Sequence, residues 1–136
     1  MTKTDYFDLK QIGVIHSPLK NLEDCPLQGH EGAPEATLEV YPEFADGLDG
    51  LETGSELIVL TWFHQSDRTV IKTYPRNFKD LPPIGVFGTR SPARPNPIGL
   101  HRVIITRVEK GKLMVKPMEA LDGTPVVDIK PVIKDA

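Results

Sequence analysis

The sequence lacks the features that would place the protein in a membrane or in a disulfide scaffold. Only one of its 136 residues is a cysteine, Cys25, so no disulfide can form within the chain. A lone thiol suits a reducing compartment. No apolar run approaches the roughly 20 residues that a membrane helix needs, and the N-terminal MTKTDYFDLK has no apolar core of a secretion signal. We expect a cytoplasmic protein with no membrane partner.

Signals for metal binding, dinucleotide binding and covalent catalysis are also missing. None of the four scattered histidines pairs with Cys, Asp or Glu at the spacing of metal ligands, so we expect no metal site. No glycine-rich dinucleotide fingerprint is present. Ser91 is not flanked by the two glycines of the G-x-S-x-G turn that presents a nucleophilic serine. Cys25 lies among acidic residues that disfavour a thiolate.

Charge is present but segregated. The net charge is −3, yet residues 21–56 hold ten acidic residues and no Lys or Arg, whereas residues 57–116 hold eleven basic and three acidic residues. Such asymmetry can mark an anionic partner for the basic half. The alternative is that the two halves interleave in the fold and neutralise each other.

The hydrophobic pattern indicates mainly β-structure in one domain spanning residues 1–136. A length of 136 residues suits a single core. The apolar run 57–63 predicts a strand buried on both sides. In 98–108 we expect Ile98, Leu100 and residues 103–105 to face the interior. Further strands are predicted at 12–16, 36–41, 113–118 and 126–129.

One helix is predicted, at residues 42–51. Pro42 suits its first turn, and Phe44, Leu48 and Leu51 fall on one face. Many short strands separated by turns predict an all-β, mainly antiparallel barrel or sandwich with one or two short helices.

The segment RSPARPNP, residues 90–97, has little conformational freedom. Each proline fixes its own φ and restricts the residue before it. The segment therefore holds Arg90, Arg94 and Asn96 in set directions, which suits recognition of a carboxylate, a phosphate or a base edge. The alternative is a rigid connector whose arginines pair with the acidic half.

Two other segments have both a structural and a functional interpretation. Asp122-Gly123 within LDGTPVVDIKP, residues 121–131, predicts a turn before a strand. By itself it is an ordinary hairpin turn, or a turn whose carboxylate and backbone accept a ligand's polar groups. His64, which follows the apolar run, is either a satisfied core histidine or a ligand contact at the end of the strand.

Six segments together resemble one known family. They are GVIHSP (13–18), PLQG (26–29), YPEFADGLDGLE (41–52), FH (63–64), GVFGTRSPARPNPIGL (85–100) and LDGTPVVDIKP (121–131). In this order they are similar to the TsaA-like, or TrmO, family of tRNA (adenine-N6)-methyltransferases. The resemblance implies a small antiparallel β-barrel, a homodimer, and S-adenosyl-L-methionine bound near the dimer interface.

The resemblance also implies which residues form the site. The cofactor contacts carried over by motif are Pro26, Leu27, Gln28, His64, Gln65, Arg90, Leu100, Leu121, Asp122, Gly123 and Thr124. The implied reaction is N6-methylation of threonylcarbamoyladenosine at tRNA position 37, in the anticodon loop. The candidates for contact with this substrate are Arg94, Asn96, Arg76 and Lys79.

We expect direct transfer of the methyl group to nitrogen, for which alignment is the main catalytic need. An acceptor for the N6 proton would assist, and the candidates are Asn96, Asp122 and Asp128, in that order. Two alternatives keep the cofactor. One is methylation of a small molecule, which the acidic net charge favours, and the other is a binding module without catalysis.

Overall fold

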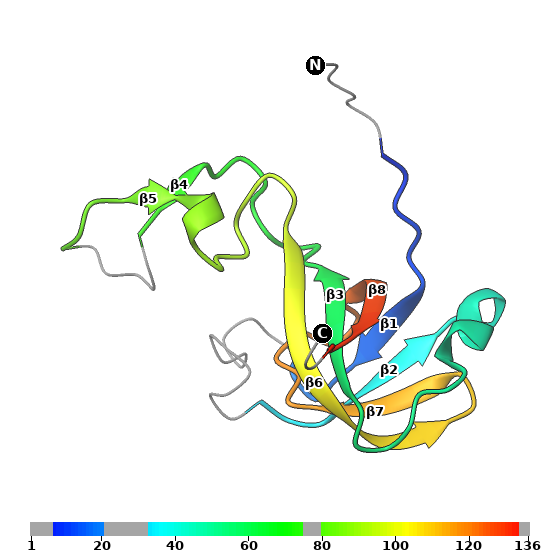
Figure 1. The fold of residues 1–136 in the computed structure, drawn as a ribbon. Coiled ribbons are helices and arrows are strands. Elements are labelled where there is room, and N and C mark those ends of the chain that lie inside the picture. The colour runs from blue at the N-terminus through cyan, green and yellow to red at the C-terminus, as the bar shows by residue number, and fades with distance from the viewer. Residues whose placement is uncertain (1–6, 21–32, 75–79, 134–136) are drawn as a thin grey trace.

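The computed structural model describes residues 7–20, 33–74 and 80–133. Six strands form a closed antiparallel barrel in the order β1-β2-β7-β6-β3-β8. They are β1 (Gly13–His16), β2 (Ala36–Val40), β3 (Glu56–Trp62), β6 (Ile98–Glu109), β7 (Lys112–Lys116) and β8 (Pro125–Pro131). The prediction of a mainly antiparallel β-barrel is therefore confirmed (Figure 1).

The barrel closes between its first and last strands. Gly13 lies opposite Val126, and Val14 lies opposite Pro125. Gly13 is required there, because a Cβ at this position would collide with the backbone carbonyl of Glu39 on β2. Closure pairs both edges of this six-stranded sheet, so the barrel itself has no open strand edge.

The core fills the barrel with alternate residues of each strand. On β3 these are Leu57, Val59 and Thr61, while the residues between them are only partly buried. The prediction that this strand is buried on both sides is wrong, because a barrel strand has one face inside and one outside. The apolar run reflects a half-covered outer face.

The inward face of β6 also differs from the prediction. Val103 and Ile105 are buried as expected, but Ile98, Leu100 and Ile104 are 43%, 46% and 43% exposed. The interior positions near the start of the strand belong instead to Gly99 and His101. Side chains alternate with period 2, so a one-residue error moves the whole row to the other face.

The predicted helix exists but is shorter and tighter. Residues Pro42–Leu48 form a 3₁₀ helix, η3, with Pro42 in its first turn. As predicted, Phe44, Leu48 and Leu51 pack together against the core, although Leu51 lies beyond the end of the helix. Among the described residues, no helix is long and apolar enough to cross a membrane.

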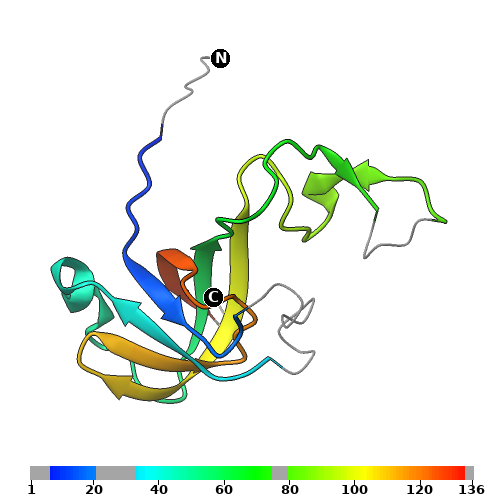
Figure 2. The same ribbon diagram turned by 180° about the vertical axis from the view of Figure 1, so that it is seen from behind.

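Residues between β3 and β6 form an arm that extends away from the barrel. It contains the short strands β4 (Lys72–Thr73) and β5 (Ile84–Gly85), which pair with each other, and the 3₁₀ turn η5 (Val86–Gly88). In both views β4 and β5 lie far from the barrel strands (Figures 1 and 2). The sequence analysis predicted none of these short elements.

Candidate functional site

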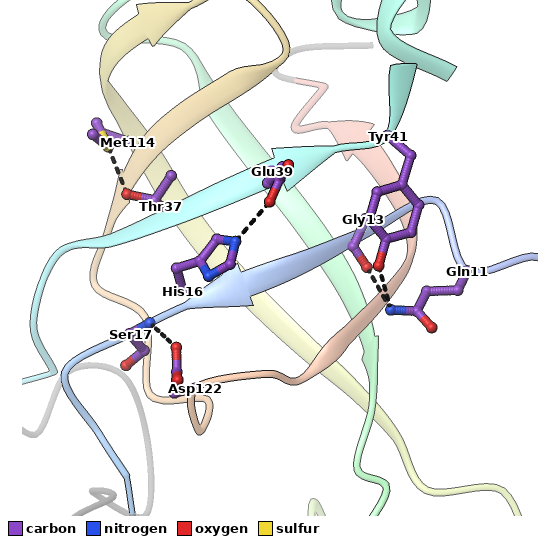
Figure 3. Close-up of polar contacts among 9 residues, drawn as sticks. All are labelled: Gln11, Gly13, His16, Ser17, Thr37, Glu39, Tyr41, Met114 and Asp122. Atoms are coloured by element: carbon purple, nitrogen blue, oxygen red, sulfur yellow. Dashed lines mark hydrogen bonds and ion pairs between the residues drawn. The ribbon is translucent and has the colours of Figure 1, made fainter. Parts of the chain in front are cut away.

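The LDGT turn connects β7 to β8 and is fixed to the end of β1. The backbone N–H groups of Asp122 and Gly123 donate to the carbonyls of Leu19 and Ile15, both at 2.7 Å. Gly123 has a φ of +85°, which glycine adopts without strain. In return, the Ser17 N–H donates to Asp122 Oδ1 at 2.9 Å (Figure 3). The turn therefore has a defined geometry rather than that of a loose hairpin loop.

Asp122 carries a stabilised negative charge. The hydrogen bond from the Ser17 backbone, followed by that from Lys20, lowers the pKa of Asp122 below its ordinary value of 3.8. Lys20 Nζ lies 2.9 Å from Asp122 Oδ2, and the Asp122 side chain is 35% exposed. The carboxylate is therefore ionised at neutral pH and partly open to a ligand.

The other three residues of the turn offer mainly backbone groups. Leu121 and Thr124 are 7% and 1% exposed, so their side chains are part of the core. Thr124 Oγ1 donates to the Leu121 carbonyl at 2.7 Å. Gly123 is exposed. A ligand at this turn would meet the Asp122 carboxylate and the backbone around Gly123.

The predicted PLQ segment, Pro26 to Gln28, lies outside the described residues, but both of its flanks meet the loop that carries the turn. On one side Leu19 accepts the Asp122 N–H. On the other side Pro34 accepts the Met118 N–H at 2.9 Å. The chain thus leaves and rejoins the barrel beside the LDGT turn. Arg76 and Lys79 also lie outside the described residues.

His64 and Gln65 follow the end of β3 and are both exposed. The core interpretation of His64 is therefore wrong. The chain is tied here to the start of β6, because the Phe63 N–H donates to the Pro97 carbonyl at 2.8 Å. Leu100, two residues into β6, has its side chain on the outer face of the barrel.

In the proline loop, Arg94 points back into its own backbone. Its guanidinium donates to the carbonyls of Val86 at 2.7 Å, Thr89 at 2.5 Å and Ser91 at 2.8 Å. Three charge-assisted bonds to carbonyls brace a loop that the prolines already stiffen. Arg90, by contrast, is exposed and has no ion pair among the described residues.

Asn96 lies where the arm joins the barrel. Its Oδ1 accepts a hydrogen bond from Arg68 Nη2 at 3.3 Å, and Arg68 Nε donates to the Pro95 carbonyl at 2.8 Å. The Arg68 guanidinium also lies 5.0 Å from the centre of the Trp62 ring. Arg68 and Trp62 were not predicted from the sequence as part of the site. No local pattern links Arg68 to Asn96, which lies 28 positions later.

Asp128 is not brought to this region. It lines a cavity of about 490 Å³ together with residues of η3 such as Phe44 and Leu48. Its Oδ1 accepts the Ile129 N–H, and its Oδ2 pairs with Lys130, both at 2.9 Å. Asp128 was the third candidate from the sequence for the proton acceptor, after Asn96 and Asp122, and the fold separates it from the LDGT turn.

The segregated charges are partly interleaved. Arg102 of the basic half bonds Glu56 of the acidic half at 2.9 Å, and Thr106 donates to Glu35 at 2.6 Å. On the arm, neither Lys72 nor Arg90 has a carboxylate partner among the residues that the structure describes. The predicted pairing of the two halves is therefore confirmed for Arg102 and Glu56, and an anionic partner for the basic half stays a prediction.

The sequence matches the family described as tRNA-methyltransferase O N-terminal domain over residues 14–136. The chain belongs to the TrmO family. The family prediction is confirmed, and so is the fold, since the chain superimposes on crystal structures of Pseudomonas aeruginosa TrmO. In one of them the TM-score is 0.77 at 34% identity, covering all of this chain and 60% of that one.

Two archaeal relatives match more of their own length than TrmO does. A "Probable S-adenosyl-L-methionine-binding protein" of Methanothermobacter thermautotrophicus is 41% identical, covering 93% of this chain and 90% of the relative. An "S-adenosyl-L-methionine-binding protein" of Archaeoglobus fulgidus is 43% identical, covering 90% and 86%. The chain therefore spans most of these TrmO-like proteins, but about three fifths of the solved TrmO chain.

One polar cluster of this TrmO-family barrel was missed by sequence reasoning. His101 lies between Thr61 and Glu119, inside the barrel beside the candidate site. The available signal was the position of His101 directly after the segment 85–100, which resembles the family. In the sequence, His101 was weighed only as a possible metal ligand, and no group of three or more His, Cys, Asp or Glu side chains that could hold a metal occurs in the described ranges.

Proposed function

We propose that this chain binds S-adenosyl-L-methionine at the end of the barrel that carries the LDGT turn. The observation that carries the proposal is convergence. Both flanks of the PLQ segment bond to the loop that carries the LDGT turn, and Thr61 near the end of β3 lies opposite Val126, just after that turn, in a chain of the TrmO family. The names of the archaeal relatives support the choice of ligand.

The chemistry of the site fits this ligand. S-adenosyl-L-methionine carries a cationic sulfonium, an ammonium group and a carboxylate, and when bound it supplies an activated methyl group. The ionised Asp122 is suited to a cationic group of the ligand or to its hydroxyls, and the exposed Arg90 to its carboxylate. A carboxylate with a lowered pKa is a weak base, which favours Asp122 as a binding residue over a proton acceptor.

We propose that the methyl group is transferred to N6 of threonylcarbamoyladenosine at tRNA position 37. Two observations support an RNA substrate: the family, and the cations Lys72 and Arg90 on the arm, which lack carboxylate partners within the described ranges. A base in an anticodon loop is already accessible without opening a duplex. Asn96, Arg94, Arg76 and Lys79 remain the candidates for contact with the substrate.

The chain's own task in this reaction is alignment. Direct transfer needs no covalent enzyme intermediate, so the residues have to hold the two reactants in line and keep the acceptor nitrogen accessible. The N6 lone pair is delocalised into the ring, and an acceptor for its proton would restore nucleophilicity. Asn96 at the base of the arm is our candidate for that role, because the lowered pKa of Asp122 makes it a weak base and Asp128 lies away from the LDGT turn.

The decisive experiment uses methyl-labelled S-adenosyl-L-methionine and three acceptors. These are tRNA that carries the threonylcarbamoyl group but not the methyl, the same tRNA without the threonylcarbamoyl group, and a panel of small molecules. We expect label only in the first, with a mass gain of one methyl in that nucleoside. Transfer to a small molecule alone would replace tRNA as the substrate. Binding in a calorimeter without transfer to any acceptor would indicate a binding module.

We further propose that the protein acts as a homodimer in the cytoplasm, where its tRNA substrate would be found. The outer face of β6 carries three exposed apolar side chains, Ile98, Leu100 and Ile104, with the exposed Arg102 between the last two. Large exposed apolar side chains that share one strand face favour association. A second copy of this chain would cover these side chains.

A further inference from the structure

A buried chain of three polar side chains lies directly under the proposed site. His101 Nδ1 is 2.6 Å from Glu119 Oε1, and His101 Nε2 is 2.7 Å from Thr61 Oγ1. Thr61 is 0% exposed and His101 2%. The Phe63 ring closes one side with its edge, 5.8 Å from the imidazole and at 82° to it. Both ring nitrogens of His101 are therefore satisfied and its orientation is fixed.

The order Thr–His–Glu matches that of a nucleophilic triad, but its location excludes that chemistry. A nucleophile has to reach a substrate, and Thr61 lies inside the barrel with no exposed surface. Gly99 allows this close packing, because a Cβ there would collide with the Phe63 ring and with Thr61 Oγ1. Only Glu119 reaches the surface, with 18% of its side chain exposed.

The three residues come from the three segments that the proposed site uses. Thr61 stands three positions before His64, His101 directly follows Leu100, and Glu119 stands two positions before Leu121. The loop 117–124 has no ladder partner of its own, because β7 ends at Lys116 and β8 begins at Pro125. Within the described residues, the bond between His101 and Glu119 is the only hydrogen bond from this loop to β3 or β6.

We infer that His101 is a positioning residue for the S-adenosyl-L-methionine site. By holding Glu119, it sets the LDGT turn at a fixed distance from the residues that follow β3. His101 does not touch the ligand. It acts through the backbone that is continuous with its two partners, Thr61 on β3 and Glu119 in the loop that carries the LDGT turn. This inference rests on the proposed cofactor site but not on the identity of the methyl acceptor.

Two substitutions of His101 each remove one of its two hydrogen bonds and keep the other. In His101→Asn the amide nitrogen takes the place of Nδ1 and keeps the bond to Glu119. In His101→Gln the amide takes the place of Nε2 and keeps the bond to Thr61 instead. Both variants leave a buried amide with one partner lost, so we expect both to lower the free energy of unfolding to a similar extent.

The affinity for S-adenosyl-L-methionine, measured by calorimetry, distinguishes positioning from general stability. We expect His101→Gln to raise Kd by about tenfold, and His101→Asn to stay within about threefold of the parent. Glu119→Ala should match His101→Gln, and the double variant should be no weaker than either single variant. Thr106→Val, which removes a polar contact farther along β6, is the control and should leave Kd unchanged.

Each outcome has one interpretation. If both His101 variants bind as tightly as the parent while losing stability, the cluster serves the core alone and the inference is wrong. If both weaken binding equally, the bond to Glu119 is not the link, and the inference is again wrong. If the parent itself does not bind the ligand, the proposed cofactor site fails first. Binding shifts without tRNA methylation would uphold the positioning role and reject only the tRNA substrate.

Discussion

Asp122 illustrates how a single residue acquires its character from the fold. In the sequence it is the first residue of an Asp-Gly pair, which is common in the turns of β-hairpins and by itself indicates no function. In the barrel it receives the Ser17 N–H and the Lys20 ammonium from the segment after β1, more than a hundred positions earlier. These contacts favour the ionised form, so the Asp122 carboxylate keeps its charge to a lower pH than it would in an isolated turn.

The pKa of Asp122 predicts how stability depends on pH. The folded-state pKa lies below the ordinary 3.8, so the ionised carboxylate stabilises the fold. That contribution is complete above the ordinary value and is lost as pH falls through the lowered folded value. We expect Asp122→Asn to unfold at lower urea than the parent at neutral pH. The difference should shrink once the pH falls below about 3.8.

Lys20→Met provides the matched comparison for Asp122→Asn. It removes the ammonium but keeps the bond from the Ser17 backbone, which is the larger cause of the lowered pKa. Its effect on the urea midpoint should therefore be smaller than that of Asp122→Asn. A difference between Asp122→Asn and the parent that stays constant across the pH range would contradict the assignment.

At the scale of an element, the proline loop owes its shape to both its sequence and Arg94. The prolines restrict the backbone, and the Arg94 guanidinium then ties three carbonyls of the loop to one another. A planar fork makes such contacts to several acceptors, and a lysine ammonium does not reproduce them. The side chain predicted from sequence as a substrate contact therefore also braces the loop that presents Arg90 and Asn96.

Arg94→Lys distinguishes bracing from charge recognition. If the fork is what matters, Arg94→Lys and Arg94→Ala should lose methyl transfer to tRNA alike, by at least about tenfold, while binding of S-adenosyl-L-methionine stays measurable. Hydrogen exchange in residues 86–91 should rise in both variants. Full activity in Arg94→Lys with loss in Arg94→Ala would show instead that Arg94 acts by its charge.

Gly99 sets how tightly β3 and β6 pack at the site. Any Cβ there would meet the Phe63 ring and Thr61. We expect Gly99→Ala to reduce the free energy of unfolding by about 1–3 kcal/mol, the usual cost of overpacking a core. Gly47→Ala is the control, since its Cβ would meet nothing within 4 Å. Equal stability of the two variants in urea titrations would argue against close packing at Gly99.

At the scale of the whole molecule, barrel closure brings together the segments of the proposed site. The site combines the end of β1, the end of β3, the start of β6 and the loop before β8, which are distributed along the entire chain. Antiparallel neighbours bring these ends to the same rim of the barrel. Closure also exposes one face of every strand, and on β6 that face carries the apolar row of Ile98, Leu100 and Ile104.

This row predicts the oligomeric state. We expect light scattering to give the parent twice the mass of one chain, and Ile104→Glu to give the mass of one chain, because a buried unpaired carboxylate opposes association. Phe7→Glu is the control, since Phe7 is 82% exposed but lies before the barrel. A parent with the mass of one chain, or an Ile104→Glu variant with the parent's mass, would show that this face is not the interface.

The sequence by itself determined the local features. The hydrophobic pattern placed six strands within a few residues of their bounds, Pro42 marked the start of the helix, and Asp122-Gly123 marked the turn, because each depends on neighbouring residues alone. The family, too, could be identified from its motifs. The charge segregation was visible, although not which charges would meet.

Only the tertiary structure decided which row of β6 faces inward. Both rows hold large apolar residues, so hydrophobicity could not choose, and the single charge of Arg102 at the spacing of Ile98, Leu100 and Ile104 did not settle the choice by itself. The interior near the site is so filled by Phe63 and Thr61 that it accepts only glycine at position 99. The link from Thr61 through His101 to Glu119 joins residues 18 and 40 positions apart. Contacts of that range form only when the barrel closes.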